Sequence, residues 1–419
     1  MRKILLLVSI FFVLSLSSVY ADCIVPTDGM IIGHDTTLCY GVYDLPGNLT
    51  GQPAIRISTG DITLDCNDAT LNGGIYGMGI VMMGGYSNVI IKNCNLNGYY
   101  RAIYATGNNN IIFNNSILGL PSDNPPYGIS GGGTNFTISN NTIQGVGYGM
   151  YLGVKNSTIS NNFIFNSSFN PTTDLEGISL GASSSYNLIK NNDIIRFHNG
   201  IGLHEWVGGT RNQYNIIENN NFLYTSAGVF IWTGGSLYNI IRNNNFIYSW
   251  RGIEIIEGND NLIYHNNFIG GIYLSLNTIN TWDIGYPSGG NYWNISCLDN
   301  KQGSYQNETG SDGICDNPYY LNADNKDNYP FVHEGSWGGE IPTTTTTVPT
   351  TIVTTTATTT STIITTTISY DELVERIEDL ENRTTTLESI VNSLKNYVNL
   401  IICQLLPKGL MKEVTCPVY

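Results

Sequence analysis

Charged residues are scarce in this sequence. Asp, Glu, Lys and Arg make up 12% of the 419 residues, and 33 acidic against 18 basic residues leave a formal net charge of −15. An acidic chain without a basic cluster is a poor partner for nucleic acid or for anionic lipid. Its polar surface must come from Asn, Ser, Thr, Gly and Tyr, which suits neutral, hydroxyl-rich partners such as polysaccharide.

Long apolar runs are also missing after the first residues. No segment beyond residue 21 reaches the roughly 18 consecutive apolar residues that a membrane-spanning helix requires. Arg2 and Lys3 precede the apolar run Ile4–Leu14, and Ala21 ends a small-residue cleavage site, so residues 1–21 are expected to be a signal peptide. We therefore expect an exported protein, secreted or held at the cell surface, with no transmembrane segment in the mature chain.

Motifs for metal binding and nucleophilic catalysis are scarce as well. The sequence has no C-x-x-C pair, no serine nucleophile elbow and no repeat with clustered Asp beside a Lys or Arg base. Copper handling would need grouped His and Met. Only His198 and His204 lie near each other among the five histidines, so copper is not favoured.

The eight cysteines fall in local pairs. An even number of cysteines in an exported chain favours disulfide bonds, although the sequence does not determine their connectivity. Pairing of neighbours along the chain predicts four disulfides, which are Cys23–Cys39, Cys66–Cys94, Cys297–Cys315 and Cys403–Cys416.

The strongest pattern is the phrase Ile-x-Asn-Asn-x-Ile, which returns with small variations at steps of 21 to 30 residues. Its first residues are Ile91, Ile112, Ile138, Ile159, Ile189, Ile217, Ile241 and Ile263. Such a period belongs to repeat architectures. A Gly-apolar pair follows each phrase, so we expect two short alternating strands per repeat, joined at Asn and Gly corners.

These repeats predict an all-β, right-handed parallel β-helix over residues 55–280. The first isoleucines should stack in an inward column about 4.8 Å apart, and the second asparagines in a corner column whose amides bond to one another. Cys94 takes the first place of that corner column. A leucine-rich repeat would need helical or tight return arcs, and a propeller would need about 40 residues per unit. Right-handed winding follows from the crossover rule for parallel strands.

These phrases resemble the parallel β-helix repeats of NosD-like and carbohydrate-binding/sugar-hydrolase (CASH) proteins. The closing stretches Trp282–Trp293, Gly310–Tyr319 and Asp324–Phe331 are similar to the C-terminal segment of archaeal NosD-like surface proteins. The resemblance covers roughly Cys23–Phe331 and implies a β-helix fold. It implies no single activity, because the family mixes copper-handling, polysaccharide-acting and structural members.

Other segments flank the repeats. Residues 22–54 form a Cys-bracketed cap, 281–337 an Asp-, Gly- and aromatic-rich closing segment, and 338–369 a threonine-rich stalk. Residues 370–406 carry five heptads that predict a coiled coil, as a parallel dimer or a trimer, and 407–419 form a Cys-containing tail. The alternative for 370–406 is an amphipathic helix that folds back on its own chain.

The best candidate site lies on the side of the coils between residues 196 and 258. Alignment on the Gly-Ile pairs places His204, Trp232 and Ile256 in one outward column, and Glu205, Thr233 and Glu257 in the next. The candidate glycan-binding residues are His204, Trp206, Trp232, Trp250 and Arg251, and the candidate catalytic residues are Glu205, Glu254 and Glu257. Glu205 and Glu257 would lie about 9.6 Å apart, near the carboxylate separation of inverting glycosidases. The alternative is that these aromatic and charged side chains are simply exposed on the solenoid and bind nothing.

Two further sets of residues could bind ions or glycans. Four aspartates of the closing segment could bind Ca²⁺, although a turn cluster that caps the last coil is the alternative. These are Asp312, Asp316, Asp324 and Asp327. Glycosylation sequons begin at Asn48, Asn135, Asn156, Asn166, Asn294, Asn307 and Asn382.

Three functions are compatible with these features. The first is an exported β-helix protein that binds glycan or a cell-envelope polymer and forms homo-oligomers through residues 370–406. The second is a polysaccharide hydrolase or lyase that acts through carboxylates on the side face. The third is a structural surface or stalk protein without a ligand. The residues favour the first.

Overall fold

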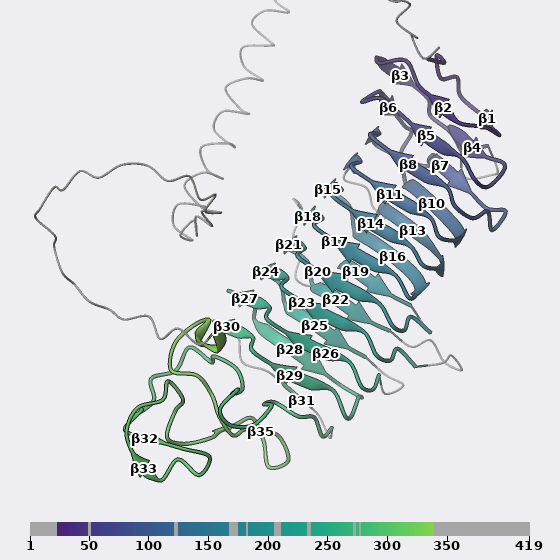
Figure 1. The fold of residues 1–419 in the computed structure, drawn as a ribbon. Coiled ribbons are helices and arrows are strands. Elements are labelled where there is room, and N and C mark those ends of the chain that lie inside the picture. Colours follow the sequence, from purple (N-terminus) through teal and green to yellow (C-terminus); the bar gives the residue numbers. More distant parts are fainter. Residues whose placement is uncertain are drawn as a thin grey trace, which may run out of the picture. The chain divides into compact units, whose positions relative to one another are not determined.

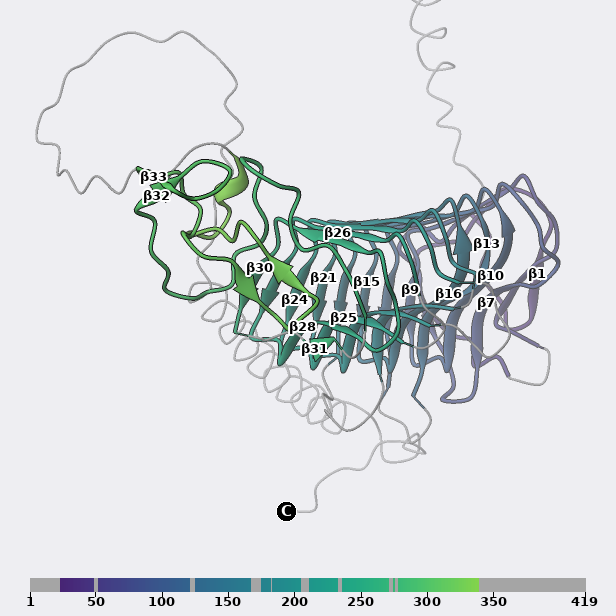
Figure 2. The same ribbon diagram turned by 90° about the horizontal axis from the view of Figure 1, so that it is seen from below.

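The computed structural model describes residues 23–48, 52–120, 125–166, 175–181, 183–204, 211–232, 236–270, 274–275 and 278–338. In this part of the chain the backbone winds as a solenoid with three parallel sheets (Figure 1). Figure 2, turned by 90°, again shows strands of successive coils side by side along the solenoid. The expected β-helix fold is therefore present. No helix of the described residues is long and apolar enough to cross a membrane.

In the described residues each coil contributes one strand to each sheet, except that β31 extends the first sheet alone. The first sheet holds β1 (Met30–Ile32), β4 (Ile55–Ile57), β7 (Met78–Met82), β10 (Arg101–Asn108), β13 (Tyr127–Thr134), β16 (Tyr148–Lys155), β19 (Glu176–Leu180), β22 (Asn199–Leu203), β25 (Ala227–Ile231), β28 (Arg251–Ile255) and β31 (Leu274–Ser275). The second holds β2 (Thr36–Thr37), β5 (Thr63–Asp65), β8 (Ile90–Lys92), β11 (Ile111–Phe113), β14 (Thr137–Ser139), β17 (Thr158–Ser160), β20 (Leu188–Lys190), β23 (Ile216–Glu218), β26 (Ile240–Arg242) and β29 (Leu262–Tyr264). The third holds β3 (Val42–Asp44), β6 (Thr70–Asn72), β9 (Asn95–Asn97), β12 (Ser116–Leu118), β15 (Thr142–Gln144), β18 (Phe163–Phe165), β21 (Asp193–Ile195), β24 (Asn221–Leu223), β27 (Asn245–Ile247) and β30 (Asn267–Ile269).

The expectation of two strands per repeat is wrong, because the repeat phrase itself contains two. In the phrase at Ile112, β11 ends at Phe113, the corner follows, and β12 begins at Ser116. Asn114, the first asparagine, has φ 54°, a left-handed conformation that Asn tolerates better than most residues. The first asparagine therefore turns the chain from the second sheet to the third.

The interior of the solenoid is made of stacked identical side chains. The first isoleucines of the phrases lie in register in the second sheet and are fully buried, as predicted. Phe222, Phe246 and Phe268 stack in the third sheet with ring centroids 4.9 Å apart. A Cβ at Gly228 would collide with the Phe246 ring, which explains why glycine precedes the apolar residue in this strand.

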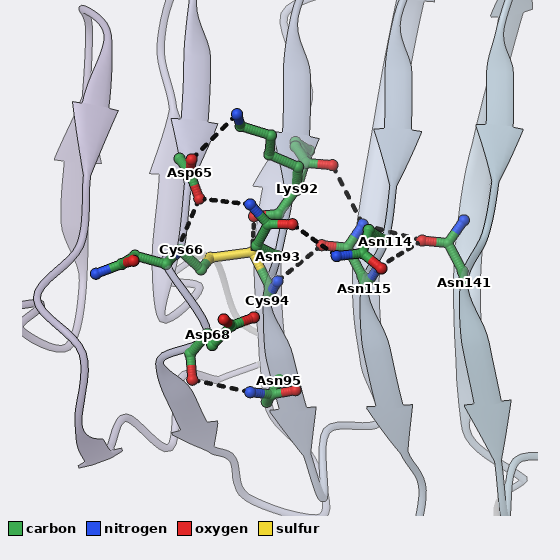
Figure 3. Close-up of a disulfide and its surroundings, with 12 residues drawn as sticks. Asp65, Cys66, Asp68, Lys92, Asn93, Cys94, Asn95, Asn114, Asn115 and Asn141 are labelled. Atoms are coloured by element: carbon green, nitrogen blue, oxygen red, sulfur yellow. Dashed lines mark hydrogen bonds and ion pairs between the residues drawn. A yellow bond between two sulfur atoms is a disulfide. The ribbon is translucent and has the colours of Figure 1, made fainter.

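The second asparagines form a continuous buried ladder from Asn115 to Asn291. In each step the side-chain nitrogen donates to the next oxygen at 2.9 to 3.0 Å, and that oxygen also accepts a backbone N–H. Cys94 begins the column, and its N–H donates to Asn115 at 3.0 Å (Figure 3). The predicted corner column is therefore present.

A second buried ladder was not predicted. It runs through Asn187, Asn215, Asn239, Asn261 and Asn280, again with steps of 2.9 to 3.0 Å. Each of the first four lies two residues before the first isoleucine of a phrase. This position closes the corner between the first and second sheets, so amides satisfy buried backbone groups at two corners of each coil.

Three disulfides match the expected pairs. The structure contains Cys23–Cys39, Cys66–Cys94 and Cys297–Cys315, while Cys403 and Cys416 lie outside the described residues. Cys66–Cys94 joins two successive coils at the start of the asparagine column (Figure 3). The sheets begin at Met30, within the segment expected to be a cap, so residues 30–44 supply the first coil.

The closing segment ends both ladders. It contains the antiparallel pairs β32 (Lys301–Gln302) with β33 (Glu308–Thr309) and β34 (Tyr319–Tyr320) with β35 (Lys326–Asp327), followed by η1 (Ser336–Gly338). Asn325 accepts the Asn280 N–H at 2.9 Å, and Asp327 accepts the Asn291 N–H at 2.7 Å. Two polar side chains therefore continue the ladders beyond the last coil, where unpaired donors would otherwise remain.

The predicted coiled coil and threonine-rich stalk lie outside the described residues.

Candidate functional site

The outer face of the first sheet carries aromatic and charged side chains in neighbouring columns. Alignment of its strands places outward side chains in columns that run along the solenoid. One column contains Arg101, Tyr127, Tyr148, Glu176, Asn199, Ala227 and Arg251. The next contains Tyr104, Ser130, Tyr151, Ser179, Gly202, Phe230 and Glu254. The sheet therefore presents aromatic and charged groups together.

Tyrosines dominate this face at β13 and β16. Tyr127 and Tyr148 stack with ring centroids 5.0 Å apart, and Tyr151 meets both edge-on at 5.7 and 5.8 Å. The Arg101 guanidinium lies 5.2 Å from the Tyr127 ring centroid. Burial raises the pKa of the Tyr127 phenol, which therefore stays neutral and can both donate and accept hydrogen bonds.

A second aromatic cluster lies at the ends of β22 and β25. Trp232 is 40% exposed, and the nearly buried Phe230 holds it edge-on at a centroid distance of 5.3 Å. The His204 ring lies 6.0 Å from Phe230 and 6.2 Å from Trp232. The strand register places Leu203, Ile231 and Ile255 side by side, so His204, Trp232 and Ile256 form the expected column.

A buried carboxylate lies beside this cluster. The side chain of Glu176 is 3% exposed, although it starts β19 on the outer face. Its Oε1 atom accepts a hydrogen bond from Asn199 Nδ2 at 3.0 Å and lies 2.5 Å from His204 Nε2. Its other oxygen, Oε2, is buried and has no hydrogen-bond partner among the described residues. Glu176 is thus tied to His204 in the next coil.

The other candidate residues predicted for this face differ in their contacts and in their exposure. Arg251 donates to Glu254 at 2.6 Å, and its guanidinium lies 4.3 Å from the ring centroid of the strongly exposed Trp250. Glu257 is exposed and lies two residues after the end of β28. Glu205 and Trp206 lie outside the described residues, so the expected distance between Glu205 and Glu257 has no counterpart here.

Sequence reasoning missed Glu176. Its signal was present, because Glu176 directly precedes a Gly-Ile pair and shares its column with tyrosine, asparagine and arginine. His204, by contrast, was predicted from its place after the Gly-Ile pair of the next coil. The structure adds that the two side chains meet.

The four aspartates proposed for Ca²⁺ do not converge in the structure. Asp316 accepts the N–H groups of Asn300 and Lys301, while Asp312 accepts Gln306 Nε2 at 2.9 Å. Asp327 is bonded to the ladder end, and Asp324 is exposed. Among the described residues no group of three or more His, Cys, Asp or Glu could hold a metal ion. The carboxylates of Asp312, Asp316 and Asp327 instead accept backbone N–H groups of the closing segment.

The sequons differ in accessibility. Asn166 is buried, which prevents modification of the folded chain. The other described sequon asparagines are exposed, namely Asn48, Asn135, Asn156, Asn294 and Asn307. Asn382 lies outside the described residues. Glycosylation at the exposed sites stays a prediction.

Comparison with known proteins gave one family and several solved structures. Residues 121–296 match the family model described as periplasmic copper-binding protein (NosD). The A-module of mannuronan C-5 epimerase AlgE4 from Azotobacter vinelandii is 14% identical, with 59% of this chain and 78% of that module covered and a TM-score of 0.44. An alginate lyase from Paenibacillus sp. is 16% identical, with 64% of this chain and 91% of that chain covered and a TM-score of 0.36. No curated protein sequence matched.

The described residues do not fit a copper site. Soft or imidazole ligands would have to converge, but His204 is bonded to Glu176 and His265 is stacked on Trp337. All six described cysteines are in disulfides, and no free cysteine is found among the described residues. The NosD likeness therefore concerns the repeat fold, and we derive no copper chemistry from it.

Proposed function

We propose that this NosD-like parallel β-helix repeat protein is an exported, extracellular or cell-surface protein that binds glycan on the outer face of its first sheet. The observation that carries the proposal is the cluster of Trp232, Phe230 and His204 beside the hydrogen-bonding pair of His204 and Glu176. An exposed indole supplies an apolar surface for the C–H groups of a sugar, and neighbouring polar atoms bond its hydroxyls. The low content of charge favours a neutral partner.

The cluster is suited to binding because its parts are held in place before a ligand arrives. Phe230 is buried against the sheet and packs edge-on against Trp232, so the indole has little freedom to lose. The strands beneath it are bonded on both sides within the sheet. Preorganised groups give up less conformational entropy on binding and so bind more tightly.

Binding is favoured over hydrolysis by the state of the carboxylates. Glycoside hydrolysis generally needs two carboxyl groups that flank the scissile bond. Among the described residues of this face, Glu176 is buried on His204 and Glu254 is paired with Arg251. A hydrolase or lyase that uses Glu205, Glu254 or Glu257 is the alternative, and it predicts oligosaccharide release that Glu257→Gln abolishes.

The Trp232→Ala variant tests the binding site. We expect its affinity for the glycan bound by the wild type to fall at least about tenfold, as for a central aromatic in a binding site. The measurement is isothermal titration against a panel of soluble oligosaccharides, with turnover assayed in parallel. Phe113→Ala is the matched control, since Phe113 is 36% exposed but lies on the second sheet. Unchanged binding by Trp232→Ala would contradict the proposed site.

We further propose that residues 370–406 oligomerise the chain through their heptads. Two or three copies would then present several glycan sites to one polymer and raise the overall avidity. Sedimentation of the mature chain should show a dimer or trimer, and replacing both Leu380 and Leu387 by Asp should give a monomer. A wild-type chain that sediments as a monomer at micromolar concentration would exclude the coiled coil.

A further inference from the structure

The contact between Glu176 and His204 determines which ring nitrogen of His204 can accept a hydrogen bond from a ligand. Glu176 is buried, and its Oε1 atom accepts from Asn199 Nδ2 while lying 2.5 Å from His204 Nε2. An ionised carboxylate can only accept hydrogen bonds, so the hydrogen of a neutral imidazole must lie on Nε2. The other ring nitrogen, Nδ1, then carries a lone pair and acts as an acceptor.

His204 is placed to use this acceptor. Its side chain is 21% exposed, and within the described part of the chain its Nδ1 atom has no hydrogen-bond partner. The ring lies against Phe230 and beside the exposed indole of Trp232. A ligand that stacks on Trp232 therefore meets an acceptor nitrogen next to an aromatic surface.

Gly202 makes the pair possible. A Cβ at this position would collide with His204 Nε2 and with Glu176 Oε1. The same column carries Tyr151, Ser179 and Phe230 in other coils, so the fold itself accepts side chains there. The absence of a side chain at position 202 leaves the space in which the carboxylate reaches the imidazole of the next column.

We propose that Glu176 positions His204 as a hydrogen-bond acceptor for a hydroxyl group of a neutral glycan that stacks on Trp232. This inference rests on the proposed function and names the class of glycan. A sugar hydroxyl can donate a hydrogen bond to Nδ1. The carboxylate of a uronate has no hydrogen to donate to Nδ1, and it would be repelled by the nearby negative charge of Glu176. The site therefore selects neutral sugars against acidic ones. Glu176 is a positioning residue, because it acts through His204.

Gly202→Ala tests the pair without removing either group. The colliding atoms are side-chain ends that can move, so the variant should fold while Glu176 and His204 separate. We expect its affinity for the neutral probe bound by the wild type, from cellohexaose and mannohexaose, to fall at least about tenfold. Gly153→Ala is the matched control, because Gly153 lies on β16 of the same sheet and a Cβ there meets nothing within 4 Å.

The tautomer of His204 can be observed directly by ¹⁵N NMR of labelled histidine, with His204→Gln used for assignment. The wild type should show hydrogen on Nε2 and a bare Nδ1. Glu176→Gln keeps an acceptor oxygen and should keep this pattern, whereas Glu176→Met should lose it together with neutral-glycan binding. A merely structural role of Glu176 would not change the ratio of the two tautomers.

The outcomes separate the two proposals. Loss of binding in Trp232→Ala with wild-type affinity in Gly202→Ala and Glu176→Met would overturn the role of the pair and leave glycan binding intact. Equal wild-type affinity for hexagalacturonate and the neutral probes would overturn the selection of neutral sugars. A wild type that binds no neutral glycan at all would overturn both proposals.

Discussion

Replacing Asn192 by Leu is expected to destabilise the solenoid by about 2–4 kcal/mol, since several buried groups lose their hydrogen bonds at once. Asn192 is fully buried in the middle of the long ladder. Its oxygen accepts the N–H and the side-chain amide of Asn162 at 3.0 and 2.9 Å. Its nitrogen donates to Ile159 O, Lys190 O and Asn220 Oδ1 at 2.9 to 3.1 Å. Leucine has a similar size but meets none of these needs.

The measurement is equilibrium unfolding in guanidinium chloride under oxidising conditions. Asn221→Ala is the matched control, because Asn221 lies in the next coil and bonds Asp193 at 2.7 Å, but on the partly exposed outer side of the third sheet. We expect the control to cost less than about 1 kcal/mol. Asn192→Asp should be at least as damaging as Asn192→Leu, because a carboxylate cannot donate to three acceptors. A leucine variant as stable as the wild type would show that the ladder does not stabilise the fold.

The long ladder could be predicted because the sequence repeats it at a fixed place in a recognisable phrase. An amide that recurs every coil can bond its own copies one strand spacing away. The number of strands per coil could not be predicted in the same way. Strands of three residues, such as β11 and β12, are too short to show a period of two, and the left-handed Asn114 between them leaves no gap in the apolar pattern.

The candidate site was only half predictable for a related reason. Trp232 and His204 differ from Gly132, Gly153 and Gly181, which take the same place in earlier coils, so alignment of the repeats finds them. The role of Glu176 depends on its contact with His204, 28 positions later, and on the space left by the missing side chain of Gly202. Burial of a carboxylate on an outward face follows from neighbouring coils, and no pattern within one coil reveals it.

Asp327 should make the stability of the capped solenoid depend on pH. Complete burial, together with the nearby charge of Asp283, raises the pKa of this carboxyl to about 7, although N–H groups of Asn291, Trp293 and Tyr329 donate to it. The folded chain therefore binds this proton more tightly than the unfolded chain, in which the pKa is near 3.8. The contribution to stability is complete below about pH 4 and is lost as the pH rises through about 7.

The Asp327→Asn variant isolates this effect. A neutral amide resembles the protonated carboxyl, so the thermal midpoint of the wild type should decline relative to that of the variant between pH 5 and pH 8. The comparison with the variant is needed because burial lowers the pKa of His265, which favours the folded state as the pH rises and so opposes the change. This histidine is present in both chains, and its contribution cancels in the difference. A difference that stays constant over this range would mean that the three N–H donors outweigh burial and that Asp327 is ionised throughout.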